Sequence, residues 1–147
     1  MQPYRNPKIM KMVPETRESL VLRTDFTDDV AWESICAAIR KPVGDFRAYV
    51  DFVSDPEFEG VTADRLVSLV PKYPYRSFAF IVDKVALTHS EHPALAVDLR
   101  VEPGRAFRVI PAEMWSVENN LSLANMGFAE FADAVGSDGV FRGFSCV

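Results

Sequence analysis

The sequence has few cysteines and histidines, scattered glycines and no long apolar run. Its two cysteines, Cys36 and Cys146, show no pattern of paired spacings, so we expect a reducing compartment and no disulfide framework. No segment approaches the roughly 20 apolar residues that span a bilayer, and the first residues contain no stretch suited to a signal peptide. These absences predict a cytoplasmic protein without a membrane partner.

Short catalytic and cofactor motifs are also missing. Neither G-x-x-x-x-G-K-[ST] nor G-x-G-x-x-G occurs, and no G-x-S-x-G elbow is present to hold a nucleophilic serine. His89 and His92 flank Glu91 in one loop, where neighbouring side chains rarely converge on a metal ion. We therefore expect no cofactor.

The charge balance is acidic, with a formal net charge of -5 from 16 basic and 21 acidic residues. An acidic surface repels a phosphate backbone, so nucleic acid is not an expected partner. The chain has 147 residues, of which 48% are hydrophobic, enough for one domain with its own core. The oligomeric state stays open.

Proline and mixed charges dominate residues 1–18, which predicts an N-terminal arm, followed by a single α/β domain over residues 19–147. Apolar periodicity predicts strands at 19–26, 46–53 and 77–83 and helices at 28–40, 63–71, 112–118 and 128–135. The turn Glu102-Pro103-Gly104-Arg105 predicts a hairpin between 94–101 and 106–110.

This order of elements predicts an α/β (or α+β) fold, with a single mixed sheet of about five strands and three to four packed helices. A flavodoxin-like order keeps the first three strands parallel. A thioredoxin-like order reverses the third strand, often after a proline such as Pro74, and the hairpin slightly favours it. Because TDDV stands where a C-x-x-C motif would be, no thiol redox activity is expected.

Acidic residues gather at predicted strand ends. Asp25, Asp28 and Asp29 follow the first strand, and Asp83 ends the third strand beside Lys84. If the strands are parallel, these carboxylates face one crevice and are suited to hold Mg²⁺, with Lys84 near a phosphoryl group. The alternative is that Asp28 and Asp29 stabilise the start of a helix capped by Thr27, and that Asp83 closes a strand.

The segment 113–126 contains a polar group within apolar neighbours. Glu118, Asn119 and Asn120, together with Trp115, are suited to contact a partner protein. The alternative is structural: an asparagine ends a helix, LSLANM starts a short strand, and Trp115 belongs to the core.

Two motifs carry a family resemblance: T-D-F-x-D-D-x-x-W at 24–32 and W-S-V-E-N-N-L at 115–121. With them, the chain from about Leu20 to Phe144 resembles a bacterial family of small proteins classed as a domain of unknown function. The resemblance implies no activity. Gly127 departs from the family pattern, which tends to place an acidic residue as the cap of the last helix.

Two functions remain as hypotheses. The first is a non-catalytic, protein-binding acidic domain of immunity-like or regulatory type. The second is a Mg²⁺-dependent or phosphate-linked, receiver-like activity at the acidic cluster. The absence of catalytic motifs favours the first.

Overall fold

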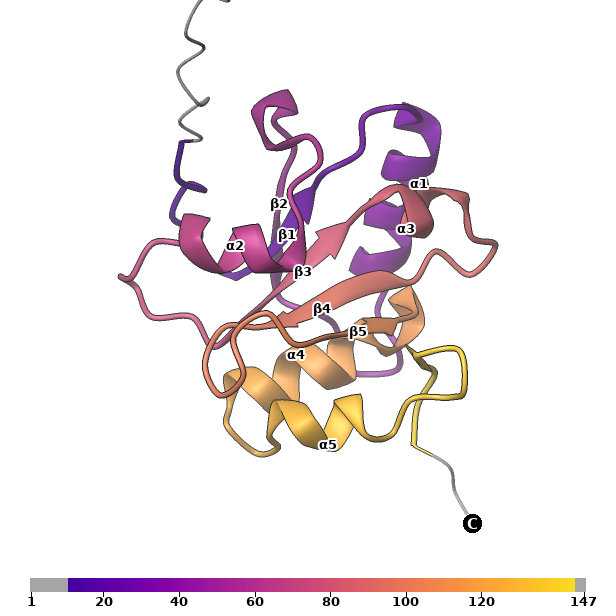
Figure 1. Ribbon diagram of the computed structural model, residues 1–147. Coiled ribbons are helices and arrows are strands. Elements are labelled where there is room, and N and C mark those ends of the chain that lie inside the picture. The colour runs from indigo at the N-terminus through magenta and orange to yellow at the C-terminus, as the bar shows by residue number, and fades with distance from the viewer. Residues whose placement is uncertain (1–10, 145–147) are drawn as a thin grey trace, which may run out of the picture.

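The computed structural model describes residues 11–144, which form one mixed sheet with helices on both faces (Figure 1). The sheet has six strands in the order β2-β1-β3-β4-β5-β6. The strands are β1 (Ser19–Arg23), β2 (Val50–Val53), β3 (Phe78–Val82), β4 (Ala94–Asp98), β5 (Ala106–Val109) and β6 (Val140–Phe141). The α/β prediction is confirmed, with one strand more than expected.

Five α-helices and two short 3-10 helices connect the strands. The α-helices are α1 (Asp29–Arg40), α2 (Ala63–Leu69), α3 (Lys84–Thr88), α4 (Met114–Ser122) and α5 (Phe128–Ala132). The 3-10 helices are η1 (Pro56–Phe58) and η2 (Pro111–Glu113). Within residues 11–144, no helix is long and apolar enough to cross a membrane.

The first three strands are parallel, since β1 lies between β2 and β3 and runs the same way as both. The flavodoxin-like order is therefore confirmed for this half, and the thioredoxin-like reversal of the third strand is wrong. After β1 the chain forms β2 on one side of β1, and it then crosses back to form β3 on the other side. The helices of the two crossovers, α1 and α2, lie against opposite faces of the sheet.

Two hydrophobic cores lie on the two faces of the sheet. Side chains alternate along β3, so Phe78, Phe80 and Val82 face the core under α1, α4 and α5. Ala79 and Ile81 face the second core, under α2 and η1. All five residues of β3 are buried, as is typical of a central strand covered on both sides.

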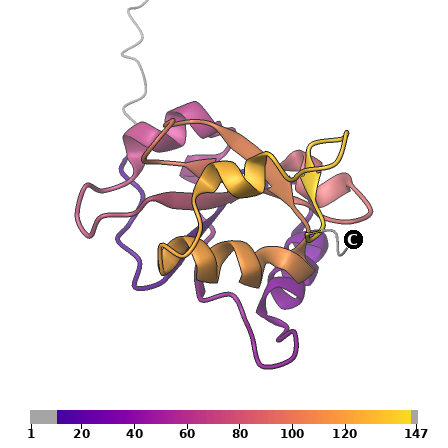
Figure 2. The same cartoon turned by 90° about the horizontal axis from the view of Figure 1, so that it is seen from below.

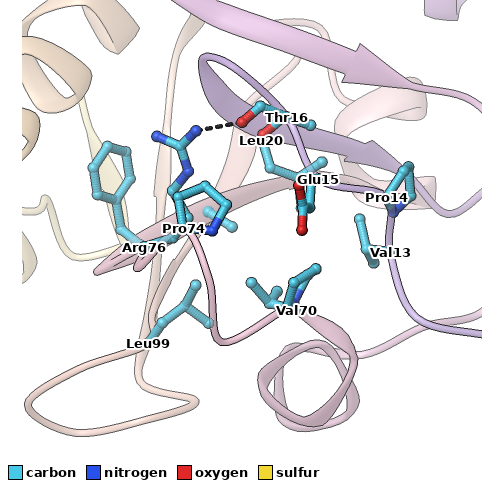
Figure 3. Close-up of a pocket in the computed structure, with 12 residues that line it drawn as sticks. Val13, Pro14, Glu15, Thr16, Leu20, Val70, Pro74, Arg76 and Leu99 are labelled. Carbon is cyan, nitrogen blue, oxygen red and sulfur yellow. Dashed lines mark hydrogen bonds between the residues drawn. The ribbon is translucent and has the colours of Figure 1, made fainter.

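The described part of the N-terminal arm, residues 11–18, contacts the second core. Val13 is 1% exposed, and its N–H donates to the carbonyl of Leu69 at 2.8 Å. Figure 3 shows the arm beside Val70, Pro74 and Leu99, with the guanidinium of Arg76 donating to the carbonyl of Thr16. These contacts attach the arm along one face of the sheet.

The turn prediction at residues 102–105 is confirmed. Arg105 N–H donates to the Glu102 carbonyl at 2.8 Å, and Gly104 has a φ of +94°, which glycine adopts readily. The strands on either side, β4 and β5, pair antiparallel. The buried carboxylate of Asp98 accepts the N–H groups of residues 100, 101 and 102, and so holds the chain that leads into this turn.

Several local predictions are wrong. Residues 46–49 belong to a loop, since β2 begins only at Val50, and the short elements α3 and β6 were not predicted. The N-cap of α1 is Asp28, whose carboxylate accepts the N–H of Ala31, instead of Thr27. Two- to five-residue elements carry too little periodicity to be seen in a sequence.

Cys36 is a small buried residue. It lies in α1 at 3% exposure within the first core. Burial disfavours the thiolate and raises the pKa of Cys36 to about 11. A thiol of this kind is protonated and unreactive at neutral pH. Cys146 lies outside the described residues.

Candidate functional site

The carboxylate of Glu118 is buried between α4 and the first two strands. Its side chain belongs to a residue 3% exposed, and its oxygens accept four hydrogen bonds. The donors are Ser19 Oγ at 2.9 Å, Tyr49 N–H at 2.9 Å, Asn119 Nδ2 at 3.0 Å and Ser122 Oγ. Every donor is neutral, so this buried carboxyl group is held in place by hydrogen bonds from uncharged groups.

Glu118 continues the pairing between β1 and β2 beyond the start of β2. Ser19 N–H donates to the carbonyl of Tyr49 at 3.1 Å, and the N–H of Tyr49 then meets the carboxylate of Glu118. The side chain thus occupies the position of a strand acceptor. Glu118 lies on the inner side of α4 and is not available to a partner.

Asn119 attaches the loop that joins α1 to β2. Its Nδ2 donates to the Arg47 carbonyl at 2.9 Å as well as to Glu118. Asn120 makes a different contact, since its Nδ2 donates to the carbonyl of Ser116 within α4. Helix α4 continues to Ser122, so the expected helix end at Asn119 or Asn120 and the expected strand after it are wrong.

The loop over residues 41–49 carries exposed apolar side chains on a fixed backbone. Val43, Phe46 and Tyr49 are 41%, 53% and 46% exposed. Val43 and Phe46 exchange two backbone hydrogen bonds, of 2.8 and 3.1 Å, and Ala48 is buried in the first core. In Figure 2 this loop, drawn in purple, projects beyond the helices around it. We call these residues, 41–49, the pinned loop.

Trp115 supports the pinned loop from α4. Its ring stacks on Phe46, with the ring centroids 4.7 Å apart and the planes at 17°. In the described chain, Trp115 Nε1 is buried and has no hydrogen-bond acceptor. Burial of an N–H without an acceptor is unfavourable in free energy. The position of the Trp115 ring is therefore determined by its stacking on Phe46 and not by a hydrogen bond of Nε1.

An apolar groove of about 510 Å³ adjoins the pinned loop. It separates the C-terminal end of α1 from η2. It is lined by Ala38, Lys41, Pro42, Val43, Glu91, His92, Ile110, Pro111 and Ala112. The groove and the pinned loop share Lys41, Pro42 and Val43, and together they form a continuous surface.

Of the four residues predicted to contact a partner, the structure brings three to the pinned loop. Trp115, Glu118 and Asn119 touch it, whereas Asn120 does not. The exposed residues Val43, Phe46 and Tyr49 were missed because 46–53 alternates with period two and so resembles a strand. The motif Pro42-Val43-Gly44-Asp45 is a turn signal and could have indicated a loop.

The predicted acidic residues lie at the carboxyl ends of β1 and β3, as parallel strands require. Asp25 accepts from the N–H and hydroxyl of Thr27, and these bonds lower the pKa of Asp25. Asp28 caps α1, and Asp29 meets Arg23 Nη2 at 2.7 Å. Each carboxylate near the first helix therefore has its own partner.

Asp83 is engaged in the same way. Two nitrogens of the Arg108 guanidinium donate to the Asp83 carboxylate, at 2.9 and 2.7 Å. Asp83 Oδ1 also accepts the N–H of Ala86. A cavity of about 350 Å³ lies between the ends of β1 and β3, with Asp25, Asp83 and Lys84 in its lining. Among residues 11–144, no three His, Cys, Asp or Glu side chains gather into a cluster able to hold a metal ion.

We expect Mg²⁺ at millimolar concentration to leave the thermal unfolding midpoint unchanged. A ligand that binds the native state raises its stability by RT ln(1 + [L]/Kd), and binding here would first have to displace Arg108 or Thr27. The measurement is a thermal melt with and without Mg²⁺, with Ca²⁺ as a control for ionic strength. A rise specific to Mg²⁺ that Asp25→Asn abolishes would support the enzymatic hypothesis instead.

Comparison with protein families finds one match, and it spans the strands, helices and loops described above. The model of a family described as "Domain of unknown function (DUF6924)" matches residues 18–144. Comparison with curated proteins finds no match. The N–H of Gly127 donates to the carboxylate of Glu130 at 2.8 Å, so the side chain that caps α5 comes from within the helix. The match covers nearly the whole chain and confirms the resemblance: this chain belongs to the DUF6924 family.

Proposed function

We propose that this protein is a non-catalytic domain that binds another protein through the pinned loop and the adjoining groove. One observation carries the proposal: three large apolar side chains are exposed on a backbone that the rest of the fold holds in place. Exposed apolar side chains that are grouped together are typical of interaction sites. The regulatory or immunity-like role considered above is a narrower form of the same proposal.

The attachment of the loop supports binding because it lowers the entropy that binding would otherwise remove. Glu118 and Asn119 fix backbone atoms at residues 49 and 47, and the stack with Trp115 fixes the ring of Phe46. A preorganised aromatic side chain is a typical centre of a protein interface.

The charges near the loop limit the kind of partner. Lys41 and Arg47 lie on the pinned loop and Arg40 directly precedes it, against one acid, Asp45. This surface is locally basic although the chain as a whole is acidic. A complementary partner surface is apolar with an acidic rim.

The proposal is tested with Phe46→Ser, which removes the exposed ring at the centre of the loop. Loss of a central aromatic anchor costs about 2 kcal/mol or more of binding, roughly a thirtyfold weaker complex. The measurement is binding to the partner obtained by crosslinking from a photoreactive group at position 43 in the source cells. Thermal melts of the same variants report stability separately.

Val101→Ser is the matched control, since Val101 is 75% exposed on the turn between β4 and β5, away from the pinned loop. We expect it to bind like the wild type. Equal binding by Phe46→Ser and the wild type would contradict the proposal, as would a crosslinked partner that Val101→Ser loses to the same extent.

A further inference from the structure

The free edge of β2 is the second surface of interest. Strand β2 is the first in the sheet order, and in the described chain it pairs only with β1. Residue 49 directs both its backbone groups inward, since its carbonyl accepts Ser19 N–H and its N–H meets Glu118. Backbone groups alternate along a strand, so Val50 and Phe52 direct theirs outward, away from β1.

A slot of about 470 Å³ runs along this edge. Its floor is β2, one wall is the arm at residues 14–17, and the other is Arg40 at the end of α1. Arg40 lies over the ring of Phe52, with 4.5 Å from Cζ to the centroid. On the arm side, Glu18 N–H donates to the carboxylate of Asp51 at 2.8 Å, and Arg76 holds the carbonyls of Thr16 and Arg17.

We propose that this slot binds an extended segment of another polypeptide, with an acidic side chain opposite Arg40, which adds to the sheet as a strand beside β2. This inference rests on the proposed function as a protein-binding domain and names the form that one partner segment takes. The outward N–H and carbonyl groups of Val50 and Phe52 supply main-chain hydrogen bonds, as in other proteins that bind peptides by strand addition.

The slot lining carries charges of both signs, Arg17 and Arg40 against Glu15 and Asp51, so the preference for an acid is confined to the position opposite Arg40. Side chains of an added strand alternate between the two faces, so one set meets Arg40 and the other meets the arm. Arg40 is exposed and lines the slot, and its guanidinium lies over the ring of Phe52, so its charge is placed at the slot. Opposite Arg40 a glutamate or aspartate is favoured and a lysine is disfavoured.

A second copy of the chain is the less favourable occupant. Pairing two β2 edges around a twofold axis would bring together two copies of Arg40 and two arms. A single extended chain brings neither, so the slot suits a peptide better than a folded copy.

The test uses linear peptides selected from a random phage-displayed library against the full chain. We expect the selected peptides to alternate β-branched or aromatic residues with acidic ones. Val50→Pro removes one outward N–H while the bonds between β1 and β2 remain, since those come from residues 49, 51 and 53. It should weaken peptide binding about tenfold, as expected for a lost backbone bond and the added ring.

Val50→Thr is the matched control, because threonine keeps both the N–H and the β-branched shape. It should bind peptide like the wild type. Arg40→Glu should weaken the acidic peptides and favour analogues in which lysine replaces the acid. If Val50→Pro unfolds at a lower temperature than the wild type, amide hydrogen exchange on the wild type tests the inference instead. A bound peptide must then slow the exchange of the Val50 and Phe52 amides.

The inference is overturned if Val50→Pro and Val50→Thr bind equally, if no peptide protects those amides, or if the chain is a dimer that only Val50→Pro separates. Each result leaves the pinned loop untouched. Weaker partner binding by Phe46→Ser would still support the proposed function. If Phe46→Ser instead bound the partner like the wild type while peptide binding was intact, only the role of the pinned loop would be rejected.

Discussion

Replacing Glu118 by alanine should lower the free energy of unfolding by about 3 kcal/mol. The substitution removes an acceptor of four hydrogen bonds and leaves the N–H of Tyr49 and the hydroxyl of Ser19 in a site closed to water. Each buried donor without an acceptor costs roughly 1–3 kcal/mol, partly offset because a buried charge is also removed. Urea unfolding at neutral pH measures the change directly.

Glu118→Gln separates the loss of hydrogen bonds from the loss of charge. The amide has the same shape, its oxygen can accept from Tyr49 N–H and Asn119, and its nitrogen can donate to the two serine hydroxyls once these rotate. We expect a cost of about 1 kcal/mol. An alanine variant as stable as the wild type would show that Glu118 does not anchor the loop.

Replacing Phe131 by alanine should lower the free energy of unfolding by about 3–5 kcal/mol, the range for a buried phenylalanine. Phe131 is fully buried, and its ring lies 5.2 Å from that of Phe141 and 6.3 Å from that of Phe107. Helix α5 is short and is attached to β5 and β6 mainly through this aromatic cluster. For a domain of this size the midpoint should fall by roughly 10 °C.

Phe144→Ala is the control for that substitution, because Phe144 touches the same cluster from its surface. Its ring centroid is 5.5 Å from that of Phe131, but the residue is 48% exposed. The expected cost is about 1 kcal/mol, since only part of the ring leaves an apolar contact. Equal losses of unfolding free energy in Phe131→Ala and Phe144→Ala would contradict the prediction, because the buried central ring would then contribute no more stability than the exposed one.

The sequence predicted the elements whose signals are local. Thr62 accepts the N–H of Arg65 at the start of α2, α1 ends at Arg40, and the hairpin turn has the geometry that Pro103 and Gly104 favour. Caps and turns act over a few residues, so a single sequence contains the information needed to locate them.

The direction of β3 and the role of Glu118 depend on contacts between distant residues. The orientation of β3 depends on whether the connection after β2 returns the chain to the same end of the sheet before β3 begins, and no local pattern in the sequence records this. Glu118 meets residues 19 and 49, which are 99 and 69 positions away along the chain. A glutamate followed by two asparagines gives no sign of such partners, so these polar neighbours suggested an exposed surface.

The hydrogen bonds from α4 to the pinned loop have a consequence for the variability of the loop. Glu118 and Asn119 bind backbone atoms, the N–H of Tyr49 and the carbonyl of Arg47, which every residue except proline at position 49 would also provide. The position of the loop is therefore largely independent of the identity of its side chains. A chain that keeps the glutamate and asparagine can exchange Asp45, Arg47 or Tyr49 and present a different surface on the same frame, so the exposed surface of the loop is free to vary while the fold stays constant.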